Sequence, residues 1–193
     1  MTRRLWKVLA LVLAVSLVAA ACGDDDDGGD GGTLTIGSIL PETGALAFLG
    51  SPMIEGVPLA VEDIREAGGE VELIQADSAT DPDTATEAAN RHIGEGADVV
   101  VGAAASGVSP GILETLRGSE IPQCSPANTS PSFAGQDNAE YYFRPVPSDD
   151  VVTPIFADAI VADGHQKVAI VARADDYGDA LSSLLDTALK DQG

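Results

Sequence analysis

Basic residues, cysteines and histidines are all scarce in this chain of 193 residues. Ten Lys and Arg stand against 31 Asp and Glu, which gives a net charge of −21. Nucleic acids and anionic membrane surfaces repel a protein this acidic, and the composition therefore excludes both as partners. It indicates a soluble, self-repelling chain, and adaptation to a salty habitat explains it more simply than a cationic ligand does.

Cysteine and histidine are too sparse to build a metal site. His92 and His165 have no Cys, His or carboxylate at metal-ligand spacing, so no metal and no cofactor is predicted. Of the two cysteines, Cys22 and Cys124, the second lies in a short run that predicts a buried strand. A free thiol behaves there as a small apolar side chain, and no flanking Lys, Arg or His lowers its pKa to make it reactive.

A long apolar run is missing too. The apolar stretch near the start extends from Val8 to Ala21, which is shorter than the roughly 20 residues that span a bilayer. A basic segment precedes it and small residues end it, a pattern typical of a secretory signal; a permanent anchor is the alternative. Val18–Cys22 resembles a bacterial lipobox, which implies a signal peptide of residues 1–21 and lipid attachment at Cys22.

Residues 22–32 are almost all Gly and Asp. Such a segment repels itself and has no apolar surface to bury, so it predicts an extended tether. A calcium-binding loop is the alternative. An EF-hand loop that opens at Asp24 needs a Glu at its twelfth position, and Thr35 stands there. The spacing therefore favours the tether.

Beyond the tether, short apolar runs alternate with helical patterns. Continuous apolar strands between helices predict a parallel sheet covered on both faces, that is, a doubly wound α/β fold. Asp81 and Pro82 open one helix as its cap and its first turn. The predicted strands are 34–40, 71–76, 98–102, 121–125, 141–144 and 167–172, and the other predicted helices are 54–67, 110–117, 149–163 and 177–190.

The chain divides into two predicted lobes. Residues 33–146 form a complete first lobe, and the helix-averse run from Arg144 to Ser148 is the crossing to the next. Residues 147–193 predict only the start of a second α/β lobe, which is incomplete. Because one strand cannot bury both its faces, either the chain is a fragment or this end packs on the first lobe in an unusual way.

Ligands of open parallel sheets bind at the carboxyl ends of the strands. The residues predicted there are small, hydroxylic or acidic, with no converging His, Lys or Arg, so acid–base catalysis is not supported and the chain is predicted not to be an enzyme. These residues are Ser38, Asp77, Ala105, Ser106 and the run from Ser125 to Thr129.

One motif suggests a serine hydrolase. Residues 107–111 read Gly-Val-Ser-Pro-Gly and match the G-x-S-x-G nucleophile elbow, and His165 could be imagined as the base. The elbow uses the backbone N–H of the residue after the nucleophile, and Pro110 has none. Ser109 is better interpreted as a helix N-cap with Pro110 at the first helical position.

Six segments, taken in order and spacing, resemble one family. They are Ile36–Gly50 (IGSILPETGALAFLG), Asp77–Pro82 (DSATDP), Val99–Ser106 (VVVGAAAS), Ile121–Pro131 (IPQCSPANTSP), Tyr142–Asp149 (YFRPVPSD) and Asp175–Gly178 (DDYG). Together they are similar to the type I periplasmic binding proteins, in the leucine/isoleucine/valine-binding family of ABC transporter substrate-binding lipoproteins. The resemblance covers the chain from about Leu34 to its last residue.

The resemblance implies the type I periplasmic-binding-protein fold with a ligand held between two lobes. In that family a serine after strand three and an A-x-T motif after strand four hold the ligand's α-carboxylate and α-ammonium. Ser106, Ala127 and Thr129 match these positions, beside Ala105, and Tyr177 matches an aromatic residue that closes over the ligand. Loop capping by the two hydroxyls and a lone interdomain aromatic are the alternatives.

The sequence departs from that family at three points. Leu49 stands beside Phe48 in a first-lobe loop where some members have a tyrosine, so the side-chain pocket differs. The acidic residue that completes the ammonium site in amino-acid binders would lie beyond Gly193. The cysteine pair of some relatives is absent.

The function implied is that of a monomeric, lipid-anchored substrate-binding protein on the outer face of the cytoplasmic membrane. It would bind a branched-chain amino acid or a similar small amino-acid or amide solute and deliver it to the permease of an ABC importer. A ligand-sensing receptor of the same fold is the alternative. With the second lobe incomplete, we expect weak or absent ligand binding by these 193 residues.

Overall fold

Five parallel strands form one sheet in the computed structural model, which describes residues 32–134 and 140–192. Their order is β2-β1-β3-β4-β5, so the chain winds outward from β1 in both directions. The predicted doubly wound α/β fold is confirmed. The strands are β1 (Leu34–Leu40), β2 (Val71–Asp77), β3 (Val99–Gly102), β4 (Gln123–Cys124) and β5 (Tyr142–Phe143).

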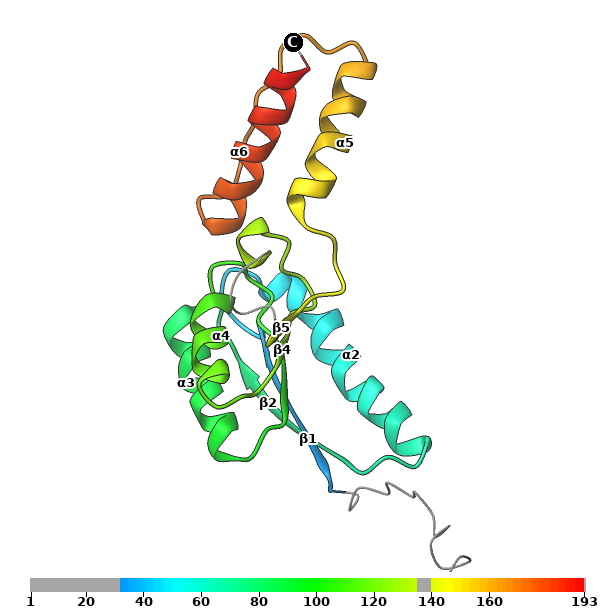
Figure 1. Ribbon diagram of the computed structural model, residues 1–193, viewed down its shortest axis with the longest axis vertical. Coiled ribbons are helices and arrows are strands. Elements are labelled where there is room, and N and C mark those ends of the chain that lie inside the picture. Colours follow the sequence, from blue (N-terminus) through cyan, green and yellow to red (C-terminus); the bar gives the residue numbers. More distant parts are fainter. Residues whose placement is uncertain (1–31, 135–139, 193) are drawn as a thin grey trace, which may run out of the picture. The chain divides into compact units, whose positions relative to one another are not determined.

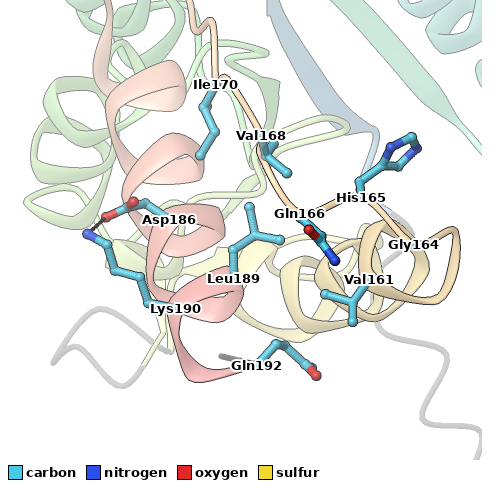
Figure 2. A pocket seen from close by; sticks show the side chains of 10 residues that line it. All are labelled: Val161, Gly164, His165, Gln166, Val168, Ile170, Asp186, Leu189, Lys190 and Gln192. Atoms are coloured by element: carbon cyan, nitrogen blue, oxygen red, sulfur yellow. Dashed lines mark hydrogen bonds and ion pairs between the residues drawn. The ribbon is translucent and has the colours of Figure 1, made fainter.

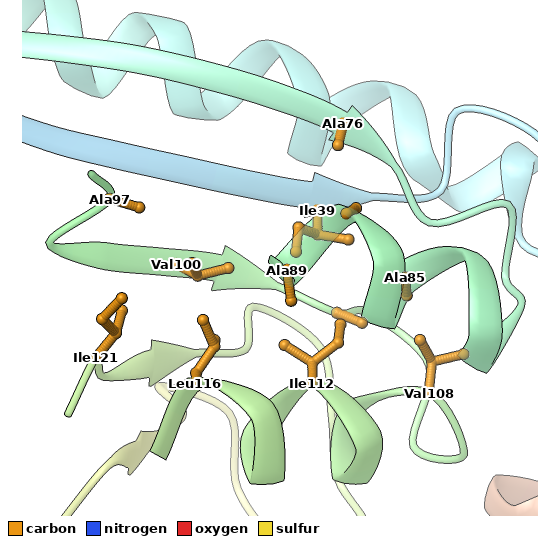
Figure 3. Packing of buried hydrophobic residues seen from close by; sticks show 12 residues of the cluster. Ile39, Ala76, Ala85, Ala89, Ala97, Val100, Val108, Ile112, Leu116 and Ile121 are labelled. Atoms are coloured by element: carbon orange, nitrogen blue, oxygen red, sulfur yellow. The ribbon is translucent and has the colours of Figure 1, made fainter. Parts of the chain in front are cut away.

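Helices cover both faces of this sheet (Figure 1). Helix α2 (Ala47–Glu66) lies on one face, and α3 (Pro82–Gly94) and α4 (Ser109–Arg117) lie on the other. Side chains of β1 alternate between the two faces, as the period of a strand requires. Ile36 therefore packs with Val61 of α2, whereas Ile39 packs into the larger cluster under α3 and α4 (Figure 3).

Local sequence signals place several element boundaries correctly. The bounds of β1 are those predicted, and α3 begins at Pro82 with Asp81 as its N-cap. The Asp81 carboxylate accepts a hydrogen bond of 2.8 Å from the backbone N–H of Thr84. Strand β4 is shorter than predicted because only Gln123 and Cys124 pair with β3 and β5.

Helix α2 begins earlier than predicted, at Ala47 and not at Ile54. The apolar period appears only after Pro52, yet the helix continues through this proline and through Pro58. Gly50 makes the early start possible, because a Cβ there would lie 2.0 Å from the carbonyl oxygen of Pro41. The first turns of α2 therefore pack directly on the chain that leaves β1.

Two helices follow the sheet, α5 (Asp149–Ala162) and α6 (Asp176–Asp191), and they pack against one another (Figure 1). The strand predicted at 167–172 is wrong, because this segment is extended but pairs with no strand. A strand needs a neighbour to satisfy its backbone groups, and none lies beside this one in the part of the chain described.

No helix within residues 32–134 and 140–192 has the length and apolar character to span a bilayer. The predicted signal peptide, the tether and Cys22 lie outside the described residues, apart from Gly32 at the tether's end. The predicted boundary between lobes near residue 146 stays a prediction.

Candidate ligand-binding site

A cavity of about 210 Å³ opens at the carboxyl ends of β3 and β4. This is the edge at which an open parallel sheet binds ligands. The structure brings all five predicted ligand residues, Ala105, Ser106, Ala127, Thr129 and Tyr177, into the wall of this cavity. The remaining wall residues are Leu46, Leu49, Met53, Ala104 and Arg173.

A buried polar network fixes the two loops that carry this wall. The Asn128 amide donates to the carbonyl of Ala104 at 2.9 Å, and the Asn128 backbone N–H donates to the hydroxyl of Ser125 at 3.0 Å. Tyr142 donates its hydroxyl to the Asn128 Oδ1 at 2.9 Å, and burial raises the pKa of Tyr142 to about 12. Because Asn128 contacts both loops, it ties the end of β3 to the end of β4.

Ser109 belongs to this network, so its interpretation as a helix N-cap is wrong. Val108 occupies the N-cap position, and the fully buried Ser109 hydroxyl donates to the Asn128 Oδ1. The Ser109 hydroxyl joins that of Tyr142 in donating to the Asn128 amide oxygen, so it is held inside the network and does not cap the helix. His165 lies elsewhere, in a groove beside α5, so no base accompanies Ser109 as a nucleophile elbow would require.

Thr129 joins the sheet edge to helix α5. Its hydroxyl donates to the Asp149 carboxylate at 2.8 Å, and the Asp149 backbone N–H donates to the Thr129 carbonyl at 2.8 Å. The Asp149 side chain is buried at 5% exposure. Since its one proton is directed to Asp149, the Thr129 hydroxyl can offer only lone pairs to the cavity.

Tyr177 and Arg173 line the cavity from the other side. Desolvation raises the pKa of Tyr177, and the Asp149 carboxylate raises it further. Sequence reasoning missed both Asp149 and Arg173. Asp149 is predicted only as the first residue of a helix and as part of a segment that resembles the family, and Arg173 has no spacing signal at all.

Apolar side chains at the N-cap and in the first turns of α2 complete the wall. Leu46, Leu49 and Met53 face the cavity, and Leu49 is the residue noted where some relatives have a tyrosine. Asp77 holds the loop before this helix, since its carboxylate accepts from the N–H groups of Glu42 and of Thr43 at 2.9 and 3.1 Å. Hence Asp77 supports the wall and does not line it.

Ser38, predicted at the ligand-binding edge, and Cys124, predicted in a buried strand, also lie off the cavity. Ser38 is buried inside β1, where its carbonyl lies 3.2 Å from Nε2 of His92. Cys124 is half-buried in β4, and burial raises the pKa of its thiol. Neither side chain lines the cavity.

A second, larger groove of about 700 Å³ lies between α5, α6 and the extended segment (Figure 2). Its wall mixes apolar side chains such as Val168 and Ile170 with His165 and the Lys190–Asp186 ion pair. Among the described residues, none that lines this groove follows a strand of the sheet. The cavity at the strand ends is the better candidate, because its polar groups are fixed by buried hydrogen bonds.

Residues 33–193 match a protein-family model described as periplasmic binding protein. The chain is 29% identical to Leu/Ile/Val-binding protein homolog 3 of Brucella melitensis, over all of this chain and 51% of the relative. It is 30% identical to Leu/Ile/Val-binding protein BraC3 of Rhizobium johnstonii, over 97% of this chain and 50% of the relative.

Among solved structures, the leucine-binding protein LivK of Thermotoga maritima shares the fold with a TM-score of 0.74. The two chains are 27% identical, over 83% of this chain and 47% of the other. The chain thus spans about half the length of the relatives it matches.

Proposed function

Because this chain belongs to the periplasmic binding protein family, we propose that it is an extracytoplasmic solute-binding protein of an ABC importer. Its ligand is a branched-chain amino acid or a similar small amino-acid or amide solute. The observation that carries the proposal is the cavity at the strand ends, where three hydroxyl groups and one basic side chain share the wall with apolar side chains.

The polar groups suit the two ends of a zwitterion. The hydroxyl of Ser106 can donate to a carboxylate, and so can the backbone N–H of Ala127, whose bond to the Ser125 hydroxyl is long at 3.4 Å. The hydroxyl of Thr129 can accept from an ammonium group, because Asp149 takes its proton and adds a negative charge behind it. Asp149 thus supplies, inside the described residues, a carboxylate near the position where the ammonium is proposed to bind.

The apolar wall suits an aliphatic side chain. Leu46, Leu49 and Met53 are unable to hydrogen-bond a polar group, whereas burying a leucine side chain among them stabilises the complex by about 1.5–3 kcal/mol. Tyr177 covers the ligand from α6 in this proposal. Closure about residues 144–149 would then present the loaded protein to the permease.

The remaining parts of the proposal follow from the first residues and from the site's chemistry. A lipid at Cys22 would hold a monomeric receptor at the outer face of the cytoplasmic membrane. The protein binds its ligand without chemical change, since Ser109 is sequestered by Asn128 and no general base lines the cavity among the described residues.

The proposal is tested by titrating the full-length protein with leucine, valine, small amides, urea and aromatic acids, followed by NMR shifts so that weak binding is detected. Thr129→Val removes the acceptor at nearly constant volume and should weaken leucine binding about tenfold. Thr129→Ser keeps the hydroxyl and serves as the control, with a much smaller effect expected. Binding of none of these solutes would reject the proposal.

A further inference from the structure

Arg173 carries the one formal charge among the ten described residues that line the cavity. Its side chain is 40% exposed and forms part of the cavity wall. No carboxylate forms part of that wall. A small, largely apolar cavity with a cation in its wall favours a ligand that carries a negative charge.

The guanidinium is held in place by a neighbouring turn. Its Nε and one terminal nitrogen donate to the Asp175 carboxylate, and Asp175 also accepts from the backbone N–H of Gly178 at 2.9 Å as the N-cap of α6. Gly178 packs so closely on Arg173 that a Cβ there would lie 1.9 Å from the Arg173 carbonyl oxygen. The turn therefore sets the position of Arg173 relative to Tyr177, one residue before that glycine.

The ion pair with Asp175 does not use up the guanidinium. Arginine has five N–H donors, and the second terminal nitrogen, Nη1, has no hydrogen-bond partner among the described residues. An exposed ion pair of this kind contributes little to stability. We therefore assign the Arg173–Asp175 pair the role of holding the guanidinium in position. A carboxylate entering the cavity meets an oriented, permanently charged donor.

We propose that Arg173 is a specificity-determining residue that recognises a carboxylate on the ligand, so that the site takes carboxylate anions in preference to the matching neutral amides. This inference rests on the proposed function and narrows it. Of the solute classes considered above, it favours amino acids and other small carboxylates over amides and urea.

The test compares L-leucine with L-leucinamide, which differ only in having a carboxylate or a carboxamide at the position that Arg173 is proposed to bind. Benzoate is added as a carboxylate without an amine. Wild type, Arg173→Gln and Arg173→Lys are each titrated by NMR as full-length proteins. We expect wild type to bind leucine roughly ten- to hundredfold more tightly than leucinamide. Arg173→Gln should remove most of that preference, chiefly by weakening leucine binding, while Arg173→Lys should retain part of it.

Each outcome separates this inference from the proposed function. If Arg173→Gln binds leucine and still prefers it to leucinamide as strongly as wild type does, the role of Arg173 is overturned and the proposed function stands. Benzoate binding that depends on Arg173, without binding of either leucine compound, rejects the amino-acid function and supports the carboxylate site. Failure of wild type to bind any of these carboxylates overturns both.

Discussion

The sheet region, residues 33–143, and the helix-pair region, residues 149–192, differ in how they treat the same kind of sequence. In the first, Ile39, Ile112 and Leu116 are fully buried. In the second, the apolar run around Val171 forms no strand, and Val171 is 95% exposed. Apolar residues in a strand-like pattern become a strand only where a neighbouring segment pairs with them and covers them.

The two regions also hold the two sides of the cavity in different ways. Loops of the sheet region are fixed by buried hydrogen bonds to Asn128, whereas Arg173 and Tyr177 depend on a half-exposed turn around Asp175. Regions with few buried contacts open at lower free energy than a packed core does. We therefore expect the helix-pair side of the cavity to open locally while the sheet side stays closed.

The largest expected effect comes from emptying the core of the sheet region. Ile112→Ala deletes a fully buried side chain from the cluster under α4 and should lower the free energy of unfolding by about 2–5 kcal/mol. Ile155→Ala makes the same change on α5, where the side chain is 66% exposed, and should cost less than about 0.5 kcal/mol. Urea unfolding followed by circular dichroism measures both, and equal losses would contradict the comparison.

A smaller effect is expected from Gly178→Ala, which breaks the turn of the helix-pair region. The added methyl would collide with the Arg173 carbonyl, and relieving that contact should cost about 1–3 kcal/mol of local stability. Hydrogen exchange should accelerate along α6 and stay unchanged in β1.

Gly56→Ala is the matched control for that glycine. Gly56 lies in α2 with no atom near its missing Cβ, so alanine there should stabilise the helix by about 0.5–1 kcal/mol. Acceleration of exchange across the sheet by Gly178→Ala would show that the two regions unfold together.

Local signals in the sequence predict the sheet region well because its elements satisfy local rules. The Asp81 cap and the apolar run of β1 can be predicted from neighbouring residues alone, without knowing the rest of the fold. The start of α2 is not, since it depends on Gly50 meeting the carbonyl of Pro41, which is a contact in space. The strand predicted at 167–172 is wrong for a different reason. Its residues have the pattern of a strand, but no described segment lies beside them to pair with them.

The candidate site divides along the same line. Ser106, Ala127 and Thr129 could be placed because they follow strands, and the strand ends of a parallel sheet converge. The role of Asp149 depends on its contact with Thr129, twenty residues away in sequence, and that of Arg173 on the turn that Asp175 makes. Neither contact has a signature in the spacing of residues.

The smallest expected effect is a pH-dependent loss of stability, which should differ between the two regions. Asp77 is partly desolvated, which raises its pKa, but hydrogen bonds from Thr43, Ala79 and Glu42 outweigh this and lower the pKa below its ordinary value of 3.8. A carboxyl with a depressed folded-state pKa stabilises the protein above the unfolded-state pKa, and this contribution is lost as pH falls through the folded-state value. Asp77→Asn should therefore cost about 1 kcal/mol at pH 7 and progressively less below about pH 4.

Asp175 offers the counterpart in the helix-pair region, because its pKa is lowered in the same way: desolvation raises it, and hydrogen bonds from Arg173 and from Gly178 outweigh that. Asp175→Asn should speed hydrogen exchange in α6 at pH 7 without changing the urea midpoint of the whole chain, since the helix pair opens before the sheet unfolds. Urea titrations of both variants between pH 7 and pH 3, with exchange measured in parallel, test this. A loss of global stability in Asp175→Asn as large as in Asp77→Asn would mean that the turn beside Arg173 is as tightly coupled to the core as the loop that Asp77 holds.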